Sequence, residues 1–322
     1  MSNVLFNGAE LFMSSGASAS VFARVDRVQD VRVNYQIPRA QVGVLGRFSP
    51  LPGQPVINYT PGSLTANYTM GNKDVPRNLG LLNTTGVAVQ IGQGTTVADW
   101  GARSFQLRNA PNAYTPVYAG QWDISTGVLK SFSLQGGVGE AVRGSFSVEA
   151  LDVRQVANTT ARTIPTYSGQ LVTPENQTLT GLSFAGLGYN GLLVQSFSFQ
   201  LTFDHAQTFN LGTKYPEKRM TSAAAVLQIS AFISGSVSNQ LTSLTGFDPG
   251  SPLAGQYVLT LQPACGPEPA MTIATTNPYL LSQSIGVQVG NFTQIEISMG
   301  APLSIIPFEC TGGSQPSNVV IT

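Results

Sequence analysis

The chain repeats one alternating pattern at two distant places, and this repetition restricts its fold more than any other feature. The segment VQDVRVNYQIPRAQVGVLG (28–46) aligns without a gap with VQSFSFQLTFDHAQTFNLG (194–212), 166 residues later. Both segments begin with Val-Gln and end with Leu-Gly. In the later segment large apolar residues alternate with polar ones, which predicts a half-buried β-strand. The apolar residues are Phe197, Phe199, Leu201 and Phe203.

The earlier segment keeps the same phase. Its aligned apolar residues are Val31, Val33, Tyr35 and Ile37. Burying four large side chains stabilises a fold by roughly 6–12 kcal/mol. A slip of one residue would turn all of them outward, so the alternation fixes the register of each strand.

Two further matches follow in order once three residues are deleted from the second copy, which changes the offset to 163. LTANYTM (64–70) aligns with LQISAFI (227–233), and SFSLQGG (131–137) aligns with QIEISMG (294–300). Three strands in the same order favour duplication over coincidence. We therefore predict two mainly antiparallel β domains, residues 1–160 and 161–322.

Loops rich in Gly, Pro, Asn and Ser separate the expected strands, and helical periodicity is almost absent. Only VADWGARSF (97–105) and VSNQLTSL (237–244) are weak helix candidates. No stretch approaches the ~18 apolar residues that a transmembrane helix needs. Cys265 and Cys310 are expected to be free buried thiols, although a disulfide between them stays open.

Charge is scarce: 10% of residues are charged and the formal net charge is zero. Such a chain has no overall attraction to nucleic acid or to an acidic membrane. A charge-poor surface also guards weakly against association, which favours a subunit that hides its surface in an assembly. Residues 1–160 carry 12 basic and 9 acidic residues (net +3), and residues 161–322 carry 4 and 7 (net −3). The two halves could attract one another, or the difference could be chance.

Residue patterns give no support to catalysis. GLGYNG (186–191) matches a dinucleotide-binding motif, but a strand follows it where a helix is required, so a glycine-rich turn is expected. His205 is the only histidine, which excludes a multi-histidine metal site, and it is expected to be exposed near a strand end. Trp100 and Trp122 are expected in the core or at an interface. We predict a protein that is not an enzyme and has no cofactor or metal.

One dense charge cluster, KYPEKR (214–219), stands out in a chain with so few charges. It is either a solvated turn or a contact to a neighbouring subunit. Its charged residues are the candidate oligomer contacts: Lys214, Glu217, Lys218 and Arg219.

The order of segments resembles the tail tube proteins of long-tailed bacteriophages, in particular forms that carry the tube fold twice. A long early strand ends in VLGR (44–47), the loop-containing segment PGSLTANYTMGNKDVPRNLGLL (61–82) follows, and GVLKSFSLQGGVGEAVRGSFSVEALDV (127–153) comes next.

The resemblance implies that each domain is a β-sandwich and that sheets of neighbouring subunits join into a barrel-like ring. Rings stack into a tube through which the tape-measure protein and DNA pass, and other tail proteins bind the tube ends. Six domain copies form a ring in that family, so two tandem copies imply a trimer with pseudo-sixfold symmetry; a hexamer is the alternative. The protein would then be a structural component of the virion tail, assembled in the host cytoplasm.

A conduit should not hold the DNA that passes through it, and uncharged polar side chains suit that task better than Lys and Arg. The polar face of 194–203 has this neutral character, whereas Arg32 in the first copy departs from it. The alternative function is a virion decoration or receptor-binding β-sandwich module, whose loops would carry exposed aromatic residues.

Overall fold

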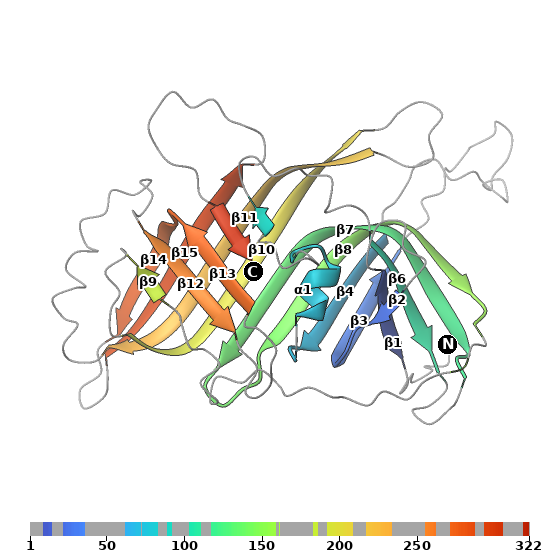
Figure 1. Cartoon of the computed structure of the whole chain (residues 1–322), viewed down its shortest axis with the longest axis horizontal. Helices are drawn as coiled ribbons and strands as arrows, with labels where there is room; N and C mark the ends of the chain where they lie inside the picture. Colours follow the sequence, from blue (N-terminus) through green and yellow to red (C-terminus); the bar gives the residue numbers. More distant parts are fainter. Residues whose placement is uncertain are drawn as a thin grey trace, which may run out of the picture.

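The protein is described here from a computed structural model (Figure 1). The described residues are 9–14, 22–35, 62–71, 73–82, 89–91, 103–110, 117–158, 161, 183–185, 192–208, 217–233, 255–261, 271–286, 293–304 and 318–321. Within them the fold is mainly β, in two antiparallel sheets. No helix among these residues is long and apolar enough to cross a membrane.

The strands of the larger sheet are β1 (Glu10–Ser14), β2 (Phe22–Arg24), β3 (Val28–Asn34), β4 (Gly62–Thr69), β6 (Arg103–Asn109), β7 (Gly120–Gly137), β8 (Arg143–Val156), β10 (Leu192–Thr208), β11 (Glu217–Ile233), β14 (Tyr279–Gly286) and β15 (Thr293–Ser304). The smaller sheet contains β5 (Val89–Ile91), β9 (Ser183–Ala185), β12 (Gln256–Leu261), β13 (Met271–Thr276) and β16 (Asn318–Ile321). A short helix, α1 (Asp74–Asn78), follows β4.

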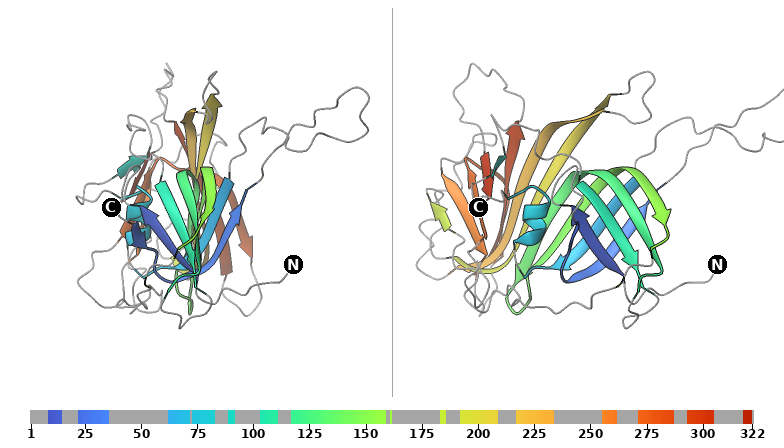
Figure 2. Two further views of the ribbon diagram at one scale, coloured as in Figure 1. Left: turned by 90° about the vertical axis from the view of Figure 1, so that its right-hand side faces the viewer. Right: turned by 45° about the vertical axis from the view of Figure 1, so that its right-hand side comes forward.

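Eight strands of the larger sheet form one continuous run in the order β3-β4-β8-β7-β10-β11-β15-β14. We call β3, β4, β8 and β7 the first unit, and β10, β11, β15 and β14 the second unit. The two units meet where residues 131–137 of β7 pair with residues 196–202 of β10. One sheet therefore spans both halves of the chain (Figures 1 and 2).

A second layer covers the inner side of each unit. In the first, the long strands β7 and β8 arch over, and the earlier part of β7 continues the sheet into β6, β1 and β2 (Figure 1). In the second, the smaller sheet, in the order β5-β16-β13-β12-β9, supplies the cover. Strand β5 comes from the first half of the chain yet pairs with β16 near its end, so the two halves also share this sheet.

Large apolar side chains of the strands form the core, in the phases that alternation predicts. Phe197, Phe199, Leu201 and Phe203 are all buried, as are Phe132 and Leu134. The alternate apolar residues of the two other matched strand pairs are buried as well: Leu64, Ala66, Tyr68, Met70, Leu227, Ile229, Ala231, Ile233, Ile295 and Ile297. By contrast, Val31 and Val33 are only half-buried and Tyr35 is exposed.

The hairpin β3–β4 repeats the pairing of β10–β11 residue by residue. Each aligned pair of the first hairpin has its counterpart in the second, and both hairpins carry a register shift at the same place, after Val28 and after Val194. The matching pairs are Val31↔Ala66 with Phe197↔Ile229, Arg32↔Thr65 with Ser198↔Gln228, and Val33↔Leu64 with Phe199↔Leu227. The sequence alignments at offsets 166 and 163 agree with this pairing.

The alignment of 131–137 with 294–300 is wrong. The second neighbour of β4 is β8, whereas the second neighbour of β11 is β15, so β15 corresponds to β8 and β14 to β7. Again the registers agree, and each hairpin has a shift at the same place, after Leu129 and after Leu280. Adjacent strands of a sheet share the same two-residue alternation, so a match by phase does not distinguish β7 from β8.

The structure also corrects the helix assignments. Arg103–Phe105, at the end of the first helix candidate, lie in β6. The second candidate, 237–244, lies outside the described residues. The one helix that the structure describes, α1, falls in a segment that we expected to be a loop, and it buries Val75 and Pro76.

Candidate functional site

Among the described residues, no second layer covers the outer face of the eight-stranded run. Because side chains alternate across a strand, the residues beside each buried position point to this face. Pairing between strands then joins them into rows across the sheet, for example Ser147, Ser131 and Thr202.

We define the polar face by these outward residues: Asn34, Thr65, Asn67, Ser145, Ser147, Ser131, Ser133, Gln135, Ser196, Ser198, Gln200, Thr202, Gln228, Ser230, Ser298, Ser282 and Ser284. All of these are uncharged hydrogen-bonding residues; the apolar side chains of Ala224 and Val226 point to the same face, opposite Thr202 and Gln200. Some form hydrogen bonds across strands: the hydroxyl oxygens of Ser133 and Ser145 are 2.7 Å apart, and the Ser230 hydroxyl accepts from the amide of Gln294, a further exposed residue of β15, at 3.0 Å.

Charges on the same face are few, and several neutralise one another. Arg32 and Asp30 form an ion pair at 3.1 Å. Lys130 and Glu149 form another at 3.3 Å. Arg143 adds one positive charge, and Asp204 and Glu296 add two negative ones. The sequence indicated Arg32 as the one departure from neutrality. Its positive charge is neutralised by Asp30 of the same strand.

The polar face of the second unit is hollowed. A cavity of about 410 Å³ lies over β10, β11, β15 and β14, with serines and glutamines making up most of its lining. Glu296 is the charged residue in that lining. The surface can hydrogen-bond to a passing molecule through many weak, similar groups, but it offers no cluster of positive charge that would retain phosphate.

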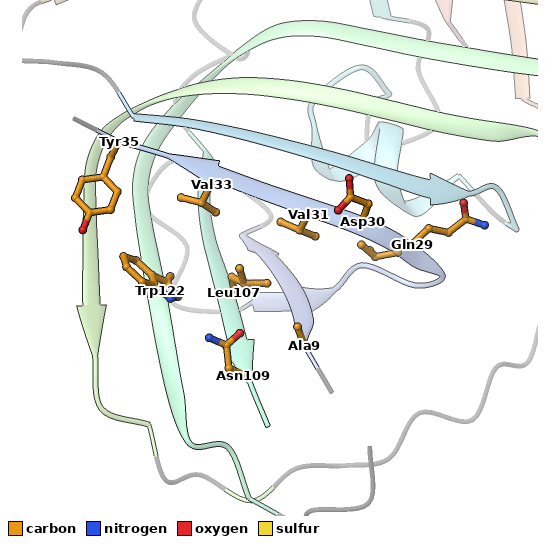
Figure 3. Close-up of a pocket in the computed structure, with 10 residues that line it drawn as sticks. Ala9, Gln29, Asp30, Val31, Val33, Tyr35, Leu107, Asn109 and Trp122 are labelled. Atoms are coloured by element: carbon orange, nitrogen blue, oxygen red, sulfur yellow. The ribbon is translucent and has the colours of Figure 1, made fainter. Parts of the chain in front are cut away.

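A second cavity, of about 580 Å³, lies along the inner side of β3. We call it the β3 groove. Val31 and Val33 face Leu107 and Trp122 across it (Figure 3). Tyr35 also lines it, with its ring centroid 5.8 Å from that of Trp122. The groove explains why this strand is less buried than β10, and it places Trp122 at the margin of the core.

The potential metal-ligating side chains of the described residues are dispersed over the fold. No three His, Cys, Asp or Glu side chains among them are grouped to hold a metal ion. The marked pKa shifts belong to two buried phenols: burial raises the pKa of Tyr68 and of Tyr257, because the ionised form would lose its hydration. His205 lies in β10 opposite Met220 and is half-buried, so our expectation of an exposed residue is wrong.

The candidate oligomer contacts lie at one end of the β10–β11 hairpin. Glu217, Lys218 and Arg219 belong to β11 and pair with Thr208, Gln207 and Ala206, so they are in a strand and not in the turn that we expected. In this part of the hairpin the described strands pair only with each other, because the pairing of β10 with β7 ends at Thr202 and the pairing of β11 with β15 ends at Ser222. It projects past the neighbouring strands (Figure 2). Their role as contacts stays a prediction.

Several other sequence predictions fall outside the described residues. They concern Lys214, Trp100, Cys265, Cys310 and the GLGYNG segment. The sequence analysis in turn missed the free edge of β14. An alignment of 127–153 with 278–304 would have indicated it, since that alignment matches Leu129, Ser131 and Ser133 with Leu280, Ser282 and Ser284.

Compared with known proteins, the chain matches no family model and has no significant match among curated proteins.

Proposed function

We propose that this chain is the structural subunit of a bacteriophage tail tube, a conduit for DNA, and that it carries the tube fold twice. The observation that carries the proposal is the fusion of two units with matching strand registers into one sheet. Two units with the same register, and the same two register shifts, are the expected outcome of an internal duplication.

The chemistry of the polar face supports a conduit. A duplex slides over a surface whose hydrogen-bonding groups are uncharged, whereas Lys and Arg would exchange counterions with its phosphates and bind it. The polar face has mostly Ser, Gln and Asn side chains and two internally neutralised ion pairs. The apolar core lies behind this face, so the polar face is available to line a lumen.

The architecture also supports assembly. A long sheet with open edges tends to associate, and closing a ring removes the exposed edges. We propose that three chains form a ring of six units with pseudo-sixfold symmetry, and that the rings stack into a tube. The tape-measure protein and DNA would pass through the lumen, and other tail proteins would bind its ends.

Negative-stain electron microscopy of the purified protein tests the proposal. We expect tubes or stacked rings. Discrete monomers or separate trimers would contradict the conduit and favour the alternative, a virion decoration or receptor-binding module.

Retention of DNA gives a second test. Assembled protein should not retain double-stranded DNA on a filter at ~0.15 M salt, because the polar face holds no excess of positive charge. Tight retention that weakens steeply with added salt would point to a nucleic-acid-binding protein and not to a conduit.

A further inference from the structure

Among the described strands, two outer edges of the eight-stranded run are unpaired, and they correspond to the two edges that β7 and β10 join inside the chain. At the centre, β7 of the first unit pairs with β10 of the second. By register, β14 corresponds to β7 and β3 corresponds to β10. Among the described strands, β14 pairs only with β15, and β3 only with β4. Each outer edge is therefore a copy of one side of an interface that the chain already makes.

We propose that β14 of one copy pairs antiparallel with β3 of a second copy, in the register of the β7–β10 junction. We call this pairing the outer junction. That it closes chains into a ring rests on the proposed function, whereas the pairing itself is inferred from the internal β7–β10 junction. Transferring the register gives four pairs among the described residues: Arg32↔Gly286, Val33↔Ile285, Asn34↔Ser284 and Tyr35↔Gln283.

Burial supports this register. At the internal junction Phe199 pairs with Leu134, and both side chains are 0% exposed. The corresponding residues at the outer edges are Val33, which is half-buried, and Ile285, which is 48% exposed. Pairing in the proposed register brings these two apolar side chains together on the core side of the joined sheet. It also places a new strand beside the β3 groove, whose valines are open in the single chain.

Beyond the register shift after Leu280, the edge of β14 carries no charge or proline that would prevent pairing. Exposed edge strands of monomeric proteins carry inward-pointing charges, Lys or Pro that prevent association. The segment SQSIG (282–286) has none of these. On the facing edge, Asp30 and Arg32 already neutralise one another, so no single charge opposes the approach of the second copy.

Cysteine pairs on the polar face test the register. In a background in which Cys265 and Cys310 are changed to Ser, the variant Asn34→Cys with Ser284→Cys should form disulfide-linked dimers and larger multimers on oxidation. A matched positive control is Ser133→Cys with Gln200→Cys, the corresponding pair at the internal junction, which should link within one chain. A matched negative control, Asn34→Cys with Ser282→Cys, is displaced by two residues along the same face.

Each outcome decides the matter. If the internal pair links but the 34/284 pair stays monomeric on a non-reducing gel, the junction is wrong. If the 34/282 pair links as well as the 34/284 pair, the register is wrong. If Ser284→Cys alone forms dimers, two β14 edges pair with each other and the head-to-tail arrangement is overturned.

A charge at the junction provides a test without cysteines. Ile285→Lys should abolish multimers in sedimentation while the circular dichroism spectrum of the chain is kept, because Ile285 is exposed in the single copy. The control is Leu281→Lys: Leu281 is also exposed, at 58%, and it corresponds to Lys130, which lies just outside the internal junction, so multimers should persist. Persistence of multimers in Ile285→Lys would overturn the proposal.

The same samples separate the junction from the proposed function. Multimers linked through 34/284 that form open filaments under the microscope would leave the junction standing and contradict the tube. Tubes that form without this link would leave the conduit standing and contradict the junction.

Discussion

Phe199 and Ser198 are adjacent in β10 but lie on opposite faces of the sheet. Phe199 is fully buried, whereas Ser198 is on the polar face. Phe199→Ala should lower the free energy of unfolding by about 3–5 kcal/mol, because it removes a large core side chain and leaves a cavity. Ser198→Ala should change it by less than ~1 kcal/mol. Urea unfolding of the two variants measures this contrast, and equal effects would contradict the strand phase.

Tyr68 makes stability depend on pH at the alkaline end. Its hydroxyl is buried without a hydrogen-bond partner among the described residues, and burial raises its pKa. The folded state therefore favours the neutral phenol. The stabilisation is present below the unfolded pKa of about 10 and is lost as pH rises above it.

Tyr68→Phe should accordingly have little effect at pH 7 and should reduce the loss of stability above pH ~10. Thermal unfolding midpoints between neutral and alkaline pH measure it. Tyr257 is buried in the same way and accounts for part of the alkaline loss that remains. An alkaline loss unchanged in a variant lacking both phenols would exclude this explanation.

At the scale of single residues, the sequence predicts which side chains of several strands are buried. Alternation identifies the buried residues of β4, β10 and β11 because each strand has a strict two-residue period. It overestimates the burial of Val31, Val33 and Tyr35. Their strand is at the edge of the sheet, and whether a strand is central or at an edge is a property of the sheet that a local pattern does not encode.

The hairpins β7–β8 and β14–β15 have the same shape but stabilise it with different chemistry. At the register shift of the first, Lys130 reaches Glu149 across the strands. At the corresponding place in the second, Leu281 lies against Gly300, where an added Cβ would approach its side chain to 2.8 Å. An ion pair in one hairpin thus replaces an apolar contact in the other.

We predict a coupling energy of about 0.2–1 kcal/mol between Lys130 and Glu149 in a double-mutant cycle to Ala, because Lys130 is partly exposed and solvent screens the pair. The coupling should fall in ~1 M salt. A cycle between Lys130 and Glu140, an exposed residue of the hairpin turn, is the control and should give no coupling. A coupling that is independent of salt would show that packing, not charge, links Lys130 to Glu149.

Element order is only partly accessible from sequence. The matches of 28–34 and 64–70 to their copies are correct because one register serves both hairpins. The match of 131–137 to 294–300 fails because neighbouring strands share the same phase. Helix α1 contains Pro76 and Asn78 and is only five residues long, too short to produce a helical period.

At the scale of the whole molecule, the fused sheet limits the size of a closed ring. Each chain contributes eight strands, so three chains give a barrel of 24. With strands ~4.8 Å apart and tilted by about 40°, such a barrel is roughly 45–50 Å across between backbones, wider than a DNA duplex. Cryo-electron microscopy should show threefold symmetry with a pseudo-sixfold wall. A true sixfold ring of twelve units would contradict the trimer and leave the conduit possible.

The sequence does not predict that the two units join into one sheet through β7 and β10. Two separate domains, 1–160 and 161–322, are the natural expectation from a duplication. Nothing in the local pattern of β7 or β10 indicates that they pair with each other, because hydrogen bonds between strands use the backbone and are independent of the side chains. Nor does the three-residue strand β5 indicate a partner more than 200 residues away, in β16.

The internal β7–β10 junction also has an arithmetical consequence. Any ring or filament built through the proposed outer junction contains an even number of units, and every second seam lies within one chain. The two units at such a seam belong to one chain and cannot dissociate from each other. An assembly can therefore come apart only at the other half of its seams. The two kinds of seam are encoded by different residues, Phe199 and Leu134 at one and Val33 and Ile285 at the other. The outer seam can therefore change in sequence, and in strength, without altering the inner one.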